Sequence, residues 1–385
     1  MAAATKSSAA SWPARSWDFE GKSRMIRFEL PTEEALLLKD TAERFVADNY
    51  ALEQRAKAIS AAPGDVPRHW AEMAELGWLV ACVPEEAGGL GLTPAQIVPM
   101  MEVLGAGLIL EPVGAVSLGC AAMLARALSP DDVAERLAPV LAGEAIEVVV
   151  AGRDGTSIAA RREGDTLVFS GASPAVIGAA AAAAFWVVAE LDGSRMLVRI
   201  PAEDAAVTPC RLVDGQAAAQ VSLDNVTVPA AEAIFDCDAA LEFGADLALV
   251  GVLAETSGVI NALHKATLDY VQMREQFGRP IGKFQVVQHK MADMFIACEE
   301  ARSMVLLAAE AMESGDAAFR ARLVSAARVK ISDAARAVLR DAVQLHGGMG
   351  VSDELAVGHM VKRLLVLTQT GGNRAAHLKR FAEAA

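Results

Sequence analysis

Apolar residues follow a helical spacing from about residue 32 to residue 143. Ile97, Met100 and Met101 recur at intervals that place them on one face of a helix. Thr32 stands directly before two glutamates, where its hydroxyl can cap a first turn that negative charge favours. The pattern therefore predicts a helical N-terminal part of the chain.

The middle of the chain has a different pattern. Short segments rich in Val, Ile and Phe are separated by Gly, Asp, Pro and Ser, which is typical of strands joined by turns. We therefore predict a small antiparallel sheet or barrel in this region. The segments are residues 147–150, 166–169, 185–188, 196–200 and 221–228.

From about residue 239 to the end the pattern is helical again, with longer helices. Ile331, Ala334 and Val338 mark one apolar stripe, and the glycines at 347 and 348 are expected to end that helix. Strands and helices do not alternate, so a doubly wound sheet is not expected. The order of elements predicts an α+β fold that is mainly helical.

The net charge is −14, from 35 basic and 49 acidic residues. An acidic surface is unsuited to nucleic acid or anionic membranes, and we find no apolar stretch long enough to cross a bilayer. The charge does not exclude an anionic cofactor, because a few local arginines can outweigh distant charges that salt screens. We expect no nucleic-acid partner and no membrane partner.

The five cysteines are scattered and form no CxxC pair, which is typical of buried thiols in a reducing cytoplasm. No HExxH motif or His/Cys cluster in the sequence indicates a metal site. Residues 1–24 are rich in Ala and Ser and lack the apolar core of a secretory signal. We therefore expect a cytoplasmic protein whose residues 1–24 form a disordered extension.

The first candidate motif is Arg-Glu-Gln-Phe-Gly-Arg-Pro-Ile at 274–281. It follows a helix predicted to end near 271–273 and precedes another that starts near Phe284. An Arg and a Gln at such a junction can hydrogen-bond a pyrophosphate, because a guanidinium supplies a full charge and a fork of donors. The alternative reading is a surface turn in which Arg274 forms an ion pair with a nearby acid.

The second candidate motif is Gln-Leu-His-Gly-Gly-Met-Gly at 344–350. It places Gln344 on the last helical turn and then glycines, which let a ligand approach the backbone closely. The alternative is an ordinary glycine C-cap. His346 is expected to be structural, because no nucleophile accompanies it.

Together these features resemble the acyl-CoA dehydrogenase family over nearly the whole chain from Met25. The order and spacing of several segments carry the resemblance, which is nearest to heteromeric members such as the small subunit of pimeloyl-CoA dehydrogenase. The matching segments, besides the two motifs, are residues 70–77, 83–91, 102–105, 223–229 and 361–372.

The resemblance implies an N-terminal helical domain at 25–143, a middle β-barrel at 144–232 and a C-terminal four-helix bundle at 233–385. It also implies FAD as the cofactor, placed at a subunit interface and held mainly by the neighbouring subunit. The residues implied to contact the ADP half of that FAD are Arg274, Gln276, Phe277, Gln285, Gln344, Gly347 and Gly348.

The chain departs from the family where a catalytic carboxylate is expected. In the family a glutamate removes the α-proton of an acyl thioester while a hydride leaves to the flavin. The resemblance places that glutamate at Gly371. A second family location corresponds to Ala248 and Leu249, again without a carboxylate. Asp246 lies two residues away, roughly 200° round a helix, and is only a weak candidate for the base.

The side that would contact the flavin ring also departs from the family. Residues 151–157 lack the family's Thr-Glu-Pro and Gly-Ser-Asp pattern, and the expected wall of the flavin ring falls near 173–175, at Ser-Pro-Ala. The resemblance implies that these strands supply hydrogen bonds to the flavin ring. Their loss therefore weakens an intrinsic flavin site.

Three hypotheses follow. The favoured one is a non-base-bearing subunit of an α2β2 acyl-CoA dehydrogenase, which clamps the ADP part of a homologous partner's FAD. Its substrate would be an acyl-CoA and its electron acceptor an electron-transfer flavoprotein. The second hypothesis is a complete homotetrameric or homodimeric dehydrogenase with an unusual base. The third is an acyl-CoA-binding or scaffold protein without redox chemistry.

Overall fold

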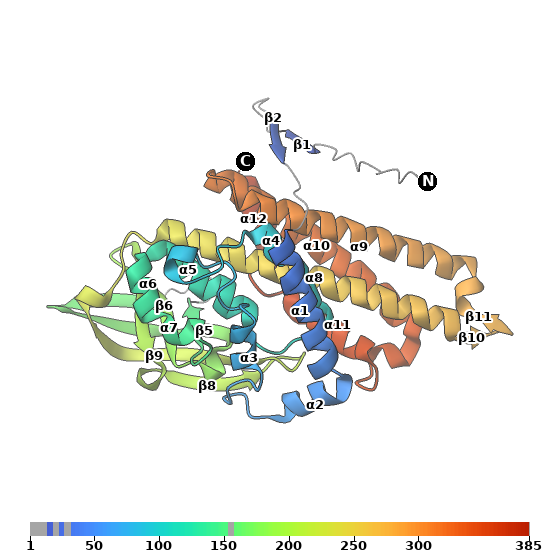
Figure 1. Ribbon diagram of the computed structural model, residues 1–385, viewed down its shortest axis with the longest axis horizontal. Helices are drawn as coiled ribbons and strands as arrows, with labels where there is room; N and C mark the ends of the chain where they lie inside the picture. The colour runs from blue at the N-terminus through green and yellow to red at the C-terminus, as the bar shows by residue number, and fades with distance from the viewer. Residues whose placement is uncertain (1–13, 18–22, 27–31, 153–157, 385) are drawn as a thin grey trace, which may run out of the picture.

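The computed structural model describes residues 14–17, 23–26, 32–152 and 158–384. It contains an N-terminal group of helices, a sheet and a long C-terminal helical bundle (Figure 1). The bundle runs along the longest axis, with the sheet at one of its ends. The predicted order of helices, strands and helices, and the mainly helical fold, are confirmed.

The N-terminal helices begin where the sequence predicts. The Thr32 hydroxyl accepts the backbone N–H of Ala35 at 3.3 Å and so caps the first helix. Ile97, Met100 and Met101 are buried on one helix, as their spacing predicts. The elements are α1 (Glu33–Asn49), α2 (Leu52–Ser60), α3 (Trp70–Glu75), η1 (Glu85–Ala87), α4 (Pro94–Ala106), η2 (Gly114–Ala121), α5 (Ala122–Ala127), α6 (Pro130–Arg136) and α7 (Ala138–Leu141).

Seven strands form one sheet, and each of the predicted segments lies within a strand. The strands are β3 (Glu147–Val150), β4 (Ile158–Glu163), β5 (Thr166–Ile177), β6 (Ala184–Leu191), β7 (Ser194–Pro201), β8 (Ala206–Arg211) and β9 (Ala217–Pro229). β4 and β8 were not predicted, because β4 buries a single residue and β8 buries none, so neither has an apolar signal.

The sheet is mixed rather than wholly antiparallel, which corrects the prediction. β6 runs parallel to both β3 and β4 and antiparallel to β7. From β4 the order continues through β5 and β9 to β8, with antiparallel pairings. Parallel neighbours need a crossover connection, and the chain between β3 and β6 provides one by way of β4 and β5.

The C-terminal bundle is packed closely against the N-terminal helices. Its helices are α8 (Asp238–Met273), α9 (Gln285–Ala311), α10 (Ala317–His346), α11 (Ala356–Leu367) and α12 (Arg374–Glu383). A side-chain carbon added at Gly258 of α8 would lie 1.9 Å from the backbone oxygen of Glu102 on α4. One added at Gly105 of α4 would lie 2.2 Å from the oxygen of Glu255 on α8. The two helices therefore cross with their backbones in contact, which only glycine permits.

The expectation that no apolar stretch is long enough to cross a bilayer was wrong for α8. By length and composition it is apolar enough to span a membrane, with a mean hydropathy of 1.5 over its most apolar window. That window is 78% buried inside the protein, because α8 packs against α4, α9 and α10. Its apolar character is therefore accounted for by its central position in the bundle.

The N-terminal extension includes two short strands. β1 (Ala14–Trp17) and β2 (Ser23–Ile26) pair antiparallel. The expectation of a disordered extension therefore does not describe these strands, and the rest of residues 1–24 lies outside the described residues.

Candidate functional site

The first motif forms a short hairpin at the end of α8. β10 (Glu275–Gln276) pairs with β11 (Arg279–Pro280) across a two-residue turn. Both turn residues have positive φ, 53° at Phe277 and 76° at Gly278, as a tight hairpin of this kind requires. The Phe277 side chain is 93% exposed. The predicted helix–helix junction is confirmed, and its residues face outward.

The second motif ends α10 as predicted. The helix stops at His346, and the backbone of Gly347 takes φ 64° and ψ −143°, a region essentially open only to glycine. The Gly347 N–H still bonds to the Val343 carbonyl, and the short helix η7 (Gly347–Val351) follows. The motif therefore forms a glycine C-cap, which was the alternative drawn from the sequence, and Gly347 and Gly348 are both exposed.

Two contacts bring the motifs to the same end of the bundle. The rings of Tyr270 on α8 and His346 on α10 stack with centroids 4.3 Å apart. Lys290, near the start of α9, forms an ion pair with Asp341 near the end of α10, at 2.6 Å. In Figure 1 this end carries β10 and β11, away from the sheet. All the residues predicted to contact the cofactor are exposed there: Arg274, Gln276, Phe277, Gln285, Gln344, Gly347 and Gly348.

Arg274 is available to bind an anion. Within the described part of the chain, no ion pair of this arginine is found, contrary to the alternative of a surface salt bridge. Arg279 lies over the Phe284 ring, 4.4 Å from its centroid, and adds a second positive charge to the hairpin. Gln276 donates its amide to the Glu275 carbonyl at 2.7 Å, leaving its side-chain oxygen free to accept. The donors at this end therefore fit an anionic phosphate-bearing group such as the ADP part of FAD.

The turn that carries Gly371 is held from inside by Arg328. This arginine is fully buried on α10, and its guanidinium donates to three carbonyls at the end of α11. Burial lowers the pKa of Arg328 to about 10. Cations at a helix C-terminus stabilise its unpaired carbonyls. The carbonyls belong to Leu367, Thr370 and Gly372, and His377 donates to that of Gly371 at 2.8 Å.

Both positions at which the family places its base are apolar, and one lies against the other. A side-chain carbon added at Gly371 would lie 3.2 Å from Cδ1 of Leu249. Ala248, the adjacent position on α8, faces η2, since its Cβ lies 3.5 Å from a carbon added at Gly119. No carboxylate stands at either position. The backbone of Gly371 has φ 73°, which a glutamate rarely adopts.

Asp246 is part of a buried ion pair rather than a free base. Its carboxylate is 1% exposed, and each of its oxygens accepts from an arginine. Arg320 donates to Oδ2 at 3.0 Å and Arg380 to Oδ1 at 2.5 Å. A carboxylate paired twice in this way has no free oxygen directed at a substrate, so the geometry does not fit the role of a base.

The sheet gives little to a flavin ring at the expected place. Ser173 lies in β5 within a register shift of its pairing with β9, between Ala172 and Ala175. Its hydroxyl donates to the Pro174 carbonyl at 2.7 Å and accepts the Val221 N–H at 3.0 Å. Both roles of the hydroxyl are therefore used within the sheet. Residues 153–157 of the other expected segment lie outside the described residues.

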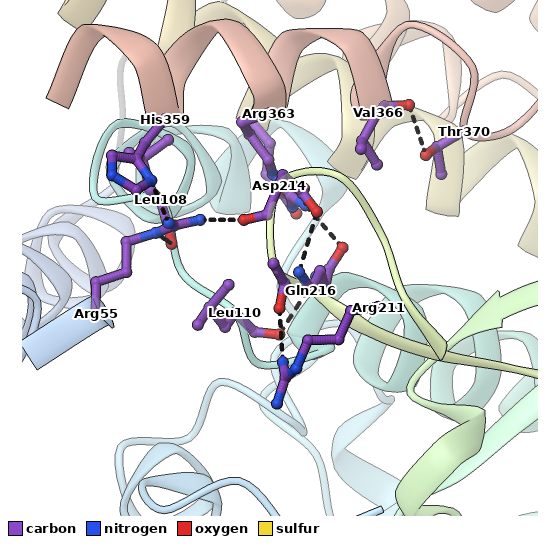
Figure 2. A network of polar contacts seen from close by, with 12 residues as sticks. Arg55, Leu108, Leu110, Arg211, Asp214, Gln216, His359, Arg363, Val366 and Thr370 are labelled. Atoms are coloured by element: carbon purple, nitrogen blue, oxygen red, sulfur yellow. Dashed lines mark hydrogen bonds and ion pairs between the residues drawn. The ribbon is translucent and has the colours of Figure 1, made fainter. Parts of the chain in front are cut away.

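A buried polar network that the sequence analysis missed joins the three parts of the chain (Figure 2). Arg363 of α11 donates to Asp214 at 2.8 Å and to Gln216 at 2.7 Å, both in the loop between β8 and β9. It also pairs with Glu255 of α8. Its guanidinium therefore ties the end of the bundle to the sheet.

Arg55 of α2 completes this network. Its guanidinium donates to Nδ1 of His359 at 2.9 Å and to the carbonyls of Asp214 and Leu108 at 2.6 Å and 3.1 Å. His359 lies four residues before Arg363 on α11, so both face the same side of that helix. Two polar residues on the buried face of an apolar helix were the sequence signal for this cluster. A cavity of about 370 Å³ adjoins it, lined in part by Arg211, His359 and Lys362.

Metal-ligating groups do not gather anywhere in the residues that the structure describes, where no cluster of three or more His, Cys, Asp or Glu could hold an ion. All the cysteines are free thiols. Burial raises the pKa of the thiols of Cys82 and Cys298 to about 12 in each case, so both are protonated at neutral pH.

Both helical parts of the chain match models of known protein domains. The model of the acyl-CoA dehydrogenase N-terminal domain matches residues 32–144, and that of the acyl-CoA dehydrogenase C-terminal domain matches residues 247–385. The acyl-CoA dehydrogenase IpdE2 of Mycobacterium tuberculosis (strain ATCC 25618 / H37Rv) is 27% identical over 332 residues, which are 84% of this chain and 88% of that protein.

Two further proteins show the same likeness. The 3-sulfinopropanoyl-CoA desulfinase of Paraburkholderia xenovorans (strain LB400) is 37% identical over 123 residues, which span 32% of this chain and 31% of that protein. A chain of the ChsE4-ChsE5 complex from Mycobacterium tuberculosis superposes with a TM-score of 0.85 at 25% identity. That superposition covers 92% of this chain and 97% of the other.

Proposed function

Since this chain belongs to the acyl-CoA dehydrogenase family, we propose that it is the non-base-bearing subunit of a heteromeric member. FAD is the cofactor of the family, and acyl-CoA thioesters are its substrates. In the proposed complex this chain grips the ADP part of an FAD whose flavin ring lies against a homologous partner. The partner supplies the base, the ring pocket and most of the acyl-CoA site.

The main support for the proposal is a difference between two parts of this chain: the residues that would contact the ADP end of FAD are present, and those expected beside the flavin ring are not. At the tip of the bundle, the exposed Arg274 and Gln276 offer free donor and acceptor groups that fit the ADP end of FAD. Where the base and the flavin ring are expected, Gly371 and Leu249 offer no carboxylate, and the Ser173 hydroxyl is engaged within the sheet. The residues thus fit FAD at one end and not at the other. A subunit that serves its neighbour's cofactor is expected to have this distribution.

The proposed division of labour follows from the chemistry. Removing the weakly acidic α-proton requires a positioned and desolvated base, and the enolate charge requires hydrogen bonds to the thioester oxygen. When bound, FAD supplies the hydride acceptor. The residues of this chain would bind and orient the pyrophosphate through charge-assisted hydrogen bonds, which are stronger than neutral ones. We propose an electron-transfer flavoprotein as the acceptor of the electrons from the reduced flavin.

The nature of the partner is supported by similarity to a two-component assembly. The chain superposes over nearly its full length on a chain of the ChsE4-ChsE5 complex. We propose an α2β2 arrangement with a homologous dehydrogenase chain that retains its glutamate. The cytoplasm is the proposed location of the complex.

Co-expression with a homologous, glutamate-bearing chain tests the proposal. We expect the lone chain to purify without stoichiometric FAD and without acyl-CoA turnover, and the pair to hold FAD with its absorbance near 450 nm. Full FAD occupancy and turnover by the lone chain would overturn it in favour of a homomeric enzyme. A colourless, inactive complex would favour a scaffold without redox chemistry.

Two charge variants test whether this chain binds the ADP part of FAD. Arg274→Gln in the complex is expected to weaken FAD binding by about 1.5–3 kcal/mol, the range for a hydrogen bond to a charged group. Arg336→Gln removes an equal charge from an exposed position on α10 away from the motif, and should leave FAD affinity unchanged. The fluorescence of flavin released from the complex measures the FAD affinity of both variants. Equal effects of the two variants would contradict the assignment.

A further inference from the structure

The two cofactor-contacting motifs come from different helices and need a fixed spacing. Arg274 and Gln276 follow α8, whereas Gln344 and Gly347 lie at the end of α10. Every one of these residues is exposed, so none is held in place by burial of its own side chain. Their relative position must therefore be set by contacts just beneath them.

The stacked rings of Tyr270 and His346 lie directly beneath both motifs. Tyr270 is one turn before Arg274, whose backbone N–H bonds to the Tyr270 carbonyl at 2.8 Å. His346 is the last residue of α10 and immediately precedes Gly347. The ring planes are inclined by 26°, with centroids 4.3 Å apart. A shift of either ring would therefore be transmitted to one motif within a single helical turn.

The His346 ring is fixed independently of the stack. It is 5% exposed, and its Nδ1 donates to the Ala342 carbonyl at 2.9 Å. This bond holds the ring plane against α10 and leaves the face turned toward Tyr270. Gly347 then turns the chain sharply away, in a conformation that other residues do not adopt. The residue that directly precedes Gly347 therefore has a ring with a fixed orientation.

We propose that Tyr270 and His346 form a positioning pair, which sets the distance between the two halves of the ADP-contacting surface. This inference rests on the proposed function, because the surface matters only if an FAD is bound there. Neither ring touches the cofactor in this proposal. They act through Arg274 on one side and through Gly347 on the other.

The test uses the complex with a glutamate-bearing partner and compares FAD with FMN, a flavin that lacks the adenylate half. Tyr270→Leu is expected to weaken FAD binding roughly three- to tenfold, as the loss of one aromatic pair implies, with FMN binding unchanged. Tyr270→Phe keeps the ring and should restore FAD affinity to within about twofold of the wild-type value. His346→Leu should repeat the effect of Tyr270→Leu.

The contact between His264 and Phe295 provides a matched control. These rings join α8 to α9 with centroids 6.1 Å apart, away from both motifs. Phe295→Leu should leave the affinities for FAD and FMN unchanged.

The outcomes separate the two proposals. A parallel loss of FAD and FMN binding in Tyr270→Leu would indicate general destabilisation and would overturn the positioning role. Unchanged FAD binding in that variant would overturn it as well, with the proposed function intact. A wild-type complex without FAD would overturn both.

Discussion

Leu249 of α8 lies against Gly371, in the turn after α11. The Leu249 Cδ1 atom is 3.2 Å from where a side-chain carbon at Gly371 would stand. The two alternative family positions for the base therefore meet at one point of this fold, and both are occupied by groups that cannot accept a proton. This coincidence makes the missing carboxylate a property of the site rather than of one residue.

Restoring the glutamate should not restore an enzyme. Gly371→Glu is expected to lower the free energy of unfolding by roughly 1–2 kcal/mol, because the backbone φ of 73° is unfavourable for any side chain. Gly371→Ala should cost about the same, since the strain arises at Cβ. Urea unfolding measures the stability, and acyl-CoA-dependent dye reduction measures the turnover. Turnover by the lone Gly371→Glu chain would show that only the carboxylate had been missing.

Asp246→Asn should destabilise the fold without affecting the chemistry. It leaves the buried Arg320 without its carboxylate, which typically costs about 3–5 kcal/mol. Asp333→Asn breaks an exposed pair with Arg374 and should cost at most about 1 kcal/mol. Thermal or urea unfolding compares the two, and turnover per folded complex should be equal. A large loss of turnover in stable Asp246→Asn protein would revive Asp246 as the base.

Glu111 should make the stability of the chain depend on pH in an unusual direction. Burial raises the pKa of its carboxyl above the ordinary 4.5, although the Tyr50 hydroxyl donates to it. The folded state therefore holds this proton more tightly than the unfolded state. The stabilising contribution is complete below pH 4.5 and is lost as the pH rises through the folded-state pKa.

The Glu111→Gln variant isolates this effect. The stability difference between the variant and the wild type should shift in favour of the variant as the pH is raised from 4.5 to 7, as measured by urea unfolding at each pH. Glu53→Gln, an exposed change on α2, should leave the pH profile unchanged. A profile of Glu111→Gln parallel to the wild type would mean that the pKa of this carboxyl is the same in the folded and unfolded states, which would contradict the prediction.

Arg363→Met should test the network that joins the bundle to the sheet. The change leaves Asp214 and Glu255 without their buried cation, and we expect a loss of about 3–5 kcal/mol. Lys362→Met, one residue earlier, breaks only the pair with the exposed Asp353 and should cost at most about 1 kcal/mol. Denaturant unfolding measures both. Similar losses would show that the network adds no more than a surface ion pair.

Some features of the site were predictable because they are local. The end of α10 follows from the glycines at 347 and 348, and the end of α8 was predicted near residues 271–273, so the exposed motifs could be placed from the sequence. The absence of a carboxylate at Gly371 was also visible there. The network around Arg363 was not, because its partners lie 108 to 149 residues away along the chain.

The sequence by itself determined the order of helices and strands, the ends of the longest helices and the identity of the residues at the expected base positions. Each depends on neighbours within a few turns, where periodicity and glycine have direct effects. Only the tertiary structure decided that Leu249 packs on Gly371, that both oxygens of Asp246 are engaged by arginines and that Tyr270 stacks on His346. Those contacts join segments distant in the chain, and packing of the whole fold selects them.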